Sequence, residues 1–99
     1  MPRSNITAKQ HMAEGRIILA LCDTNLLGKS VHEEDKILDL SKPFFQGTEV
    51  EEKKALKLIS GAGIINAVGK DSVNLLKKAG YDIKPERVKE IPHIQLVII

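Results

Sequence analysis

Length, composition and charge restrict the classes of protein that this sequence can encode. It has 99 residues, 42% of them hydrophobic and 28% charged, and a formal net charge of +2 at pH 7. This length allows one modest core and excludes a core accompanied by a separate cofactor domain, so residues 1–99 are expected to form a single domain. The small excess of positive charge predicts only a weak general attraction to phosphate polymers.

The cysteine, histidine and N-terminal patterns bear on compartment and metal binding. Cys22 is the single cysteine, which excludes an intrachain disulfide and a cysteine-built zinc site and is typical of a reducing compartment. His11, His32 and His93 lack the paired spacing of zinc ligands, so neither a metal nor another cofactor is expected. The first ten residues lack the apolar core of a signal peptide, and no apolar run reaches the length of a membrane span. We therefore expect a cytoplasmic protein without membrane contacts.

The N-terminal half of the sequence predicts strands. Ile6, Ala8 and Met12 occupy alternate positions, and "AEG" at 13–15 separates them from the apolar run 17–22, which predicts a β-hairpin. That run is apolar on both faces, as is typical of a central strand. Two further short strands are expected at residues 29–32 and 36–40, followed by a loop over "SKPFFQG".

The second half predicts two helices and a final strand. Thr48 and Glu51 have the spacing of a capping box, so a helix is expected to begin there and to end at Gly61 or Gly63. A second helix is expected over residues 70–79, with Gly80 as its left-handed stop. After a break at Pro92, a strand is expected over residues 94–99.

The order of these elements predicts an α+β fold. Early strands followed by two helices favour a mostly antiparallel or mixed sheet with both helices packed on one face. The last segment, which begins at Ile94 and finishes at Ile99, contains no charged residue. We expect it either to lie between two strands of its own sheet or to pair across a two-fold axis in a homodimer.

The stretch "CDTNLLGKS" at residues 22–30 resembles the end of a phosphate-binding loop. Gly28, Lys29 and Ser30 match that motif, but Asp23 stands where its first glycine should be. A carboxylate at the mouth of such a loop would repel phosphate, so the nucleotide-binding interpretation is rejected. Asp23 is better explained as the N-cap of a short turn that Gly28 closes.

A second phosphate-binding interpretation concerns "VGKDSVNLLKKAG" at residues 68–80. It is similar to the second half of a helix-hairpin-helix, in which a glycine turn and the following helix N-terminus present N–H groups to a phosphate. Gly69 would make this turn, and Lys70, Lys77 and Lys78 would supply positive charge. The same lysines are equally consistent with a solvated helix face.

An enzymatic interpretation rests on His93, combined with Cys22, Asp23 or Asn66, as a small hydrolase or transferase. Adjacent residues of a strand point to opposite faces, so Asp23 is not placed to activate Cys22. A free cysteine in an apolar strand usually behaves as a small hydrophobic residue. The residues therefore favour a structural role for Cys22.

Four separated segments together resemble a known family. They are "CDTNLLGK" at 22–29, "FFQG" at 44–47, "NAVG" at 66–69 and "PHIQ" at 92–95, in the order typical of the archaeal family called domain of unknown function 424. The resemblance implies an archaeal source and a compact α+β domain, and it implies no activity. Phe45 stands where the family often has tyrosine. Polar and glycine positions of these segments are Asp23, Lys29, Gly47, Asn66, Gly69, His93 and Gln95.

The sequence thus favours a non-enzymatic binding module whose partner is RNA or a ribonucleoprotein. The expected binding residues are Lys29, Asn66, Gly69, Lys70, Lys77, Lys78 and Gln95. The alternative is the small hydrolase or transferase that uses His93. We prefer the binding module to the enzyme because the sequence contains no convincing catalytic set, whereas basic residues follow Gly69.

Overall fold

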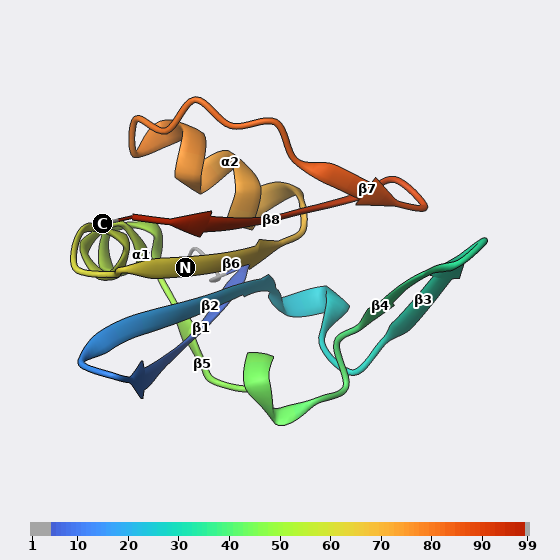
Figure 1. Ribbon diagram of the computed structural model, residues 1–99, viewed down its shortest axis with the longest axis horizontal. Coiled ribbons are helices and arrows are strands. Elements are labelled where there is room, and N and C mark those ends of the chain that lie inside the picture. The colour runs from blue at the N-terminus through green and yellow to red at the C-terminus, as the bar shows by residue number, and fades with distance from the viewer. Residues whose placement is uncertain (1–4, 99) are drawn as a thin grey trace.

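The protein is built around one six-stranded sheet with two helices (Figure 1). The computed structural model describes residues 5–98. In sheet order the strands are β5 (Thr48–Val50), β1 (Ile6–Ala13), β2 (Arg16–Asp23), β6 (Ile64–Val68), β8 (Ile91–Val97) and β7 (Glu86–Val88). Among the strands of the described residues, β2 and β6 alone pair in parallel, so the sheet is mixed. The predicted α+β class is confirmed.

The remaining elements are two helices, two short turns of 3-10 helix and a small hairpin. They are α1 (Glu52–Ser60), α2 (Lys70–Lys78), η1 (Thr24–Leu26), η2 (Pro43–Phe45), β3 (Ser30–Glu33) and β4 (Lys36–Asp39). The β3–β4 hairpin forms its own two-stranded sheet and lies at the same end of the molecule as β7 (Figure 1). Within residues 5–98, neither helix has the length and hydropathy needed to cross a membrane.

The predicted N-terminal hairpin is confirmed. β1 pairs with β2 along its whole length, from Ile6 opposite Asp23 to Ala13 opposite Arg16. Glu14 and Gly15, which connect the strands, both have positive φ angles, of 52° and 78°. Two such residues match the twist of the flanking strands, and glycine adopts the conformation without steric cost. The sequence "AEG" therefore fixes the register of the hairpin.

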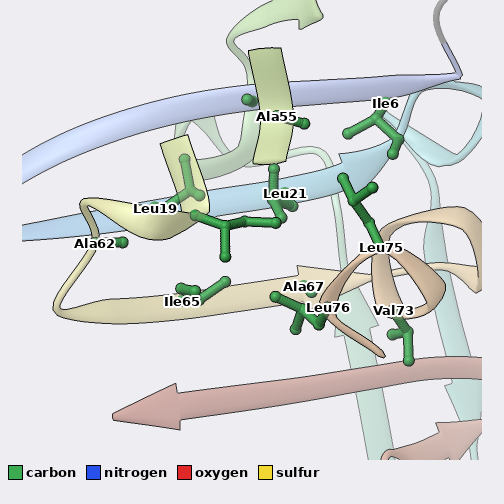
Figure 2. Close-up of a cluster of buried hydrophobic side chains, with 12 residues drawn as sticks. Ile6, Leu19, Leu21, Ala55, Ala62, Ile65, Ala67, Val73, Leu75 and Leu76 are labelled. Atoms are coloured by element: carbon green, nitrogen blue, oxygen red, sulfur yellow. The ribbon is translucent and has the colours of Figure 1, made fainter. Parts of the chain in front are cut away.

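Both helices cover the same face of the sheet, as predicted. Figure 2 shows side chains of the central strands, including Leu19, Leu21 and Ile65, pointing toward the helices. Ala55 comes from α1 and Leu76 comes from α2, and each is fully buried. Burying aliphatic side chains of this size contributes roughly 1.5 to 3 kcal/mol each, so this cluster is the main source of stability.

The central strand β6 was not predicted. Its five residues, Ile64 to Val68, lie between Gly63 and Gly69, where no helix or strand was predicted from the sequence. A short apolar run bounded by glycines does not reveal its conformation through periodicity. β6 forms the parallel pair with β2 and lies at the centre of the sheet.

The predicted capping box at Thr48 and Glu51 is wrong. Thr48 is the first residue of β5, where it lies opposite Ala8 of β1. α1 instead begins at Glu52 with Glu51 as N-cap, and no side-chain hydrogen bond caps it. Strand pairing takes Thr48 out of the helix, a long-range effect that overrides the local signal. The helix ends at Ser60 and Gly61 is its C-cap, in agreement with the predicted end.

The predicted break at Pro92 is also wrong, because Pro92 lies inside β8. β8 pairs with β6 along one side, whereas β7 reaches only as far as His93 on the other. The first alternative predicted for residues 94–99, a position between two strands, is therefore incorrect for residues 94–97, which pair with β6 alone. Its helix-side residues Ile94, Leu96 and Ile98 are half-buried, while Val97 is 58% exposed. Ile99 lies outside the described residues.

Candidate functional site

The face of the sheet opposite the helices carries a polar row. Lys9, Ala20, Asn66 and Gln95 are successive cross-strand partners from β1 to β8, so their side chains share one face. A neighbouring row on the same face consists of Thr7, Cys22, Val68, His93 and Glu86. Asn66, Gln95 and His93 thus lie close together although they are distant in sequence.

The segment around η2 covers the β1 side of this face. The His11 ring stacks on Phe44 with 4.6 Å between ring centroids and 3° between planes, and His11 Nε2 lies 3.0 Å from the Phe44 carbonyl oxygen. Lys9 Nζ donates a hydrogen bond to the Pro43 carbonyl oxygen at 3.2 Å. Phe45 packs against the second small core, which contains Cys22. These contacts hold η2 over the sheet and place Phe45 beside the open part of the face.

An open pocket of about 540 Å³ lies between Phe45 and β8. Asn66, His93 and Gln95 line it from the sheet, Phe45 and Leu38 line it from the covering segments, and Lys84 and Glu86 also contribute. Asn66 and His93 are half-buried and Gln95 is exposed. Within residues 5–98, no hydrogen bond engages the side chains of Asn66, His93 or Gln95. The pocket therefore presents two amides and an imidazole whose polar atoms are available to a ligand.

A larger hollow of about 860 Å³ lies between the start of α1 and α2. Its walls carry both signs of charge, including Glu52 and Lys78, which form an ion pair at 3.0 Å. The side chains of both partners are more than half exposed, so the pair is screened by solvent. This hollow contains none of the residues nominated by the four family segments. We therefore take the pocket beside Phe45 as the candidate site.

The N-terminus of α2 is already occupied by an internal carboxylate. Asp23 accepts hydrogen bonds from the Asp71 N–H at 3.1 Å, the Ser72 N–H at 2.8 Å and the Ser72 hydroxyl at 2.9 Å. The N–H groups of Asp71 and Ser72 therefore already have an acceptor within the protein and are not free to bind a phosphate. Asp23 does occupy the predicted N-cap position of η1, but its side chain makes no capping hydrogen bond to that turn.

Gly69 is required by this arrangement. Its φ angle is 106°, and a side chain at this position would collide with the Asp23 carboxylate. Its N–H donates to the Pro92 carbonyl oxygen at 2.8 Å. Gly69 thus has a structural role. It links the end of β6 to β8, and its lack of a side chain leaves space for the Asp23 carboxylate of β2.

The seven predicted binding residues do not form one site. Asn66 and Gln95 line the pocket, whereas Lys70, Lys77 and Lys78 belong to α2, on the opposite face of the sheet. Lys29 immediately precedes β3 at the base of the small hairpin, where its carbonyl oxygen accepts the Leu40 N–H. Of the predicted basic residues, none lines the pocket.

The predicted catalytic residues are divided in the same way. Cys22 is fully buried in the second core, and burial, followed by the nearby charge of Asp23, raises the pKa of its thiol to about 12. Its thiolate is therefore not available as a nucleophile at neutral pH. Asp23 is engaged at α2. Only His93 and Asn66 share the pocket.

Sequence reasoning missed Glu86, Lys84 and Leu38 as pocket residues. Glu86 lies directly opposite His93 in the β7–β8 ladder. The three-residue strand β7 gives too short a pattern to be recognised in the sequence. Without it, nothing local links residues 84 and 86 to the "PHIQ" segment. Within residues 5–98, no three His, Cys, Asp or Glu side chains gather as metal ligands.

The comparisons with known proteins agree with this fold. A crystal structure of an uncharacterized conserved protein from Methanopyrus kandleri is similar, with a TM-score of 0.83 and 28% sequence identity over 95% of this chain and 91% of that one. This archaeal structure supports the archaeal character implied by the sequence resemblance. No curated protein matches the sequence. Residues 11–99 match the family described as "Protein of unknown function (DUF424)", and the chain therefore belongs to that family.

Proposed function

We propose that this protein is a non-enzymatic binding module that holds an unpaired nucleotide of RNA on the helix-free face of its sheet. The observation that carries the proposal is the convergence of Asn66, His93 and Gln95, without partners among the described residues, on a pocket walled by Phe45. Three of the four family segments meet there, because Phe45, Asn66, His93 and Gln95 come from "FFQG", "NAVG" and "PHIQ".

The chemistry of these side chains suits a nucleobase. Each amide of Asn66 and Gln95 offers a donor and an acceptor side by side, which matches the edge of an unpaired base. Phe45 is half-buried and supplies an aromatic surface on which a base can stack. Lys84 is exposed at the same pocket and would meet the phosphate backbone. Single-stranded RNA is commonly recognised in this way, with bases splayed over a sheet.

The helix face suits RNA less well than this pocket. The N–H groups of Asp71 and Ser72 are bonded to Asp23, and Lys78 is paired with Glu52. Lys70 and Lys77 remain as exposed cations on α2. They would add weak, sequence-independent attraction, because phosphate contacts carry no base information.

The experiment is a fluorescence anisotropy titration with eight-nucleotide single strands of A, C, G or U at two salt concentrations. Removing one amide in Asn66→Ala or Gln95→Ala should weaken binding about fivefold, since a hydrogen bond contributes roughly 1 kcal/mol and 1.4 kcal/mol is tenfold. The loss should be largest for the preferred base. Lys77→Ala is the matched control on the opposite face and should lower affinity only slightly for all four strands.

Two results would contradict the proposal. One is the absence of binding to any of the four strands at low salt. The other is binding that Lys77→Ala weakens as much as Gln95→Ala, which would move the contact to the helix face. Because Gln95 is exposed, its replacement should leave the melting temperature unchanged, so a loss of affinity would not reflect unfolding.

A small hydrolase or transferase is the second candidate function, and one observation favours it. Glu86 lies opposite His93 on the neighbouring strand, and Asn66 lines the same pocket. In a hydrolysis, His93 would take a proton from the attacking water as general base, and Glu86 would orient the imidazole. A screen of ester and phosphate substrates tests this. Turnover that His93→Gln reduces at least a hundredfold would support the enzyme, whereas turnover that survives the change would exclude it.

A further inference from the structure

Part of strand β8 forms an open edge of the sheet. β7 pairs only with Ile91 to His93, so the following residues have a strand neighbour on one side, which is β6. The Ile98 N–H donates to the Gly63 carbonyl oxygen at 2.7 Å, and the Pro92 carbonyl oxygen accepts the Gly69 N–H at 2.8 Å. Even-numbered residues of β8 therefore direct their backbone groups toward β6.

In an antiparallel ladder, successive residues direct their backbone groups to opposite sides. The N–H and C=O groups of Gln95 and Val97 consequently point away from β6. No backbone hydrogen bond between the loop before β7 and these two residues occurs in the described chain. The edge thus presents two donors and two acceptors in a row, which is the pattern that another strand can complete.

The composition of this edge distinguishes it from the outermost strands. β5 and β7 have three residues each and carry Glu49 and the pair Glu86 and Arg87. Short, charged edge strands are the usual protection against unwanted pairing. Residues 94–98 contain no charge, and Val97 is 58% exposed. The protection present on the other strands is missing here.

We propose that this edge pairs with β8 of a second copy of the chain, antiparallel across a two-fold axis that passes beside Leu96. In this register Gln95 faces Val97 of the second copy and Val97 faces its Gln95. All four outward backbone groups of each copy are then paired, giving four hydrogen bonds in total. A register shifted toward the start of β8 would compete with β7 for the backbone groups of His93. A register shifted the other way would need Ile99, which lies outside the described residues.

The side chains also suit this register. Leu96 would meet its own counterpart, and Ile94 would meet Ile98, on the helix side where these residues are already half-buried. On the other side, the exposed Val97 of the second copy would lie beside Gln95 and add an apolar wall to the pocket. The second copy therefore contributes a residue to the candidate site. The pairing itself does not depend on which ligand that site binds.

The oligomeric state tests the proposal. Light scattering over a range of concentrations should approach twice the 10.9 kDa of one chain. Val97→Lys places a charge on the edge and should shift the protein to monomer. Met12→Lys is the matched control, because Met12 is a 70% exposed apolar residue of β1, and its mass should match the wild type. A wild-type monomer at all concentrations, or a dimer that survives Val97→Lys, would overturn the proposal.

Cysteine cross-linking tests the register. Leu96→Cys places two cysteines opposite each other as a non-hydrogen-bonded pair, with Cα atoms about 4.5 Å apart, within the range for a disulfide. Val97→Cys is the control, because its counterpart lies diagonally across the axis, beyond the roughly 7 Å limit. The native Cys22 is buried and stays silent. Oxidation should link Leu96→Cys chains only; stronger linkage of Val97→Cys would exclude this register.

Discussion

The strongest stability prediction concerns Asp23→Ala. The carboxylate of Asp23, a residue only 7% exposed at the end of β2, accepts three hydrogen bonds from the first turn of α2. Its negative charge also lies at the positive end of the helix macrodipole. Alanine removes all of these interactions. Because Ser72 is fully buried, water cannot replace the carboxylate as acceptor for its N–H and hydroxyl groups.

The size of the loss follows from the contacts. Removing an N-cap side chain costs about 1 kcal/mol. The buried hydroxyl and N–H of Ser72 then lose their acceptor, and an unsatisfied buried group costs roughly 1–3 kcal/mol. The total is about 3 kcal/mol, a large part of the roughly 5–15 kcal/mol that stabilises a typical domain. At roughly 4–8 °C per kcal/mol, the melting temperature should fall by about 12–24 °C.

Thermal and urea denaturation of three variants provide the assay. Asp23→Asn retains one acceptor for Ser72 and should be less destabilised than Asp23→Ala. Asp39→Ala is the matched control, because Asp39 accepts two hydrogen bonds from Ser41 within one exposed turn, and its loss should change stability far less. A melting temperature for Asp23→Ala within about 4 °C of the wild type would refute the reasoning.

Two further predictions concern neighbours of this carboxylate. Gly69→Ala should destabilise the protein strongly, because the new Cβ would collide with the Asp23 carboxylate. Gly80→Ala is the control, because its Cβ meets no atom and adds only the strain of a φ angle of 106°. In urea denaturation, Gly69→Ala should lose more of its free energy of unfolding than Gly80→Ala. Cys22 should resist thiol reagents at pH 8 until the protein unfolds, because the pKa of its thiol is raised from 9.0 to about 12. The folded state keeps this proton where the unfolded chain releases it, so the free energy of unfolding should fall above pH 9, and Cys22→Ala should lack that part of the fall.

The local parts of the fold could be predicted from the sequence. The hairpin β1–β2, the β3–β4 hairpin and α2 all carry their information in alternation, turn residues or helical periodicity. The stop signal at Gly80 is an example: its φ angle of 106° is the left-handed conformation that ends a helix. Such signals involve residues a few positions apart, and a single sequence displays them directly.

Long-range pairing could not be predicted in this way. Thr48 has a good local signal for starting a helix, but its pairing with Ala8 of β1 places it in a strand. Asp23 is separated from Ser72 by 49 positions, so no local pattern indicates that one caps the other. β6 was missed for a related reason, since its strand conformation depends on β2 and β8 at its sides.

The candidate site was predictable in part. Asn66, His93 and Gln95 were nominated from two family segments, but their meeting in one pocket follows from the pairing of β6 with β8. The lysines of α2 were nominated from charge alone. Charge on a helix face does not reveal which face of the sheet the helix covers, and here that face is the one opposite the pocket.

Some residues of the family segments hold neighbouring elements in place and others line the candidate pocket, and contacts in the structure connect the two groups. Asp23 holds the first turn of α2, and Gly69 fits against it at the end of the strand that carries Asn66. The Gly69 N–H then bonds to the Pro92 carbonyl oxygen, directly before His93. A chain of contacts therefore runs from "CD" through "NAVG" to "PHIQ" and fixes the relative positions of Asn66 and His93. The segment at residues 22–30, which resembles a phosphate loop, thus supports this arrangement from the helix side of the sheet through Asp23.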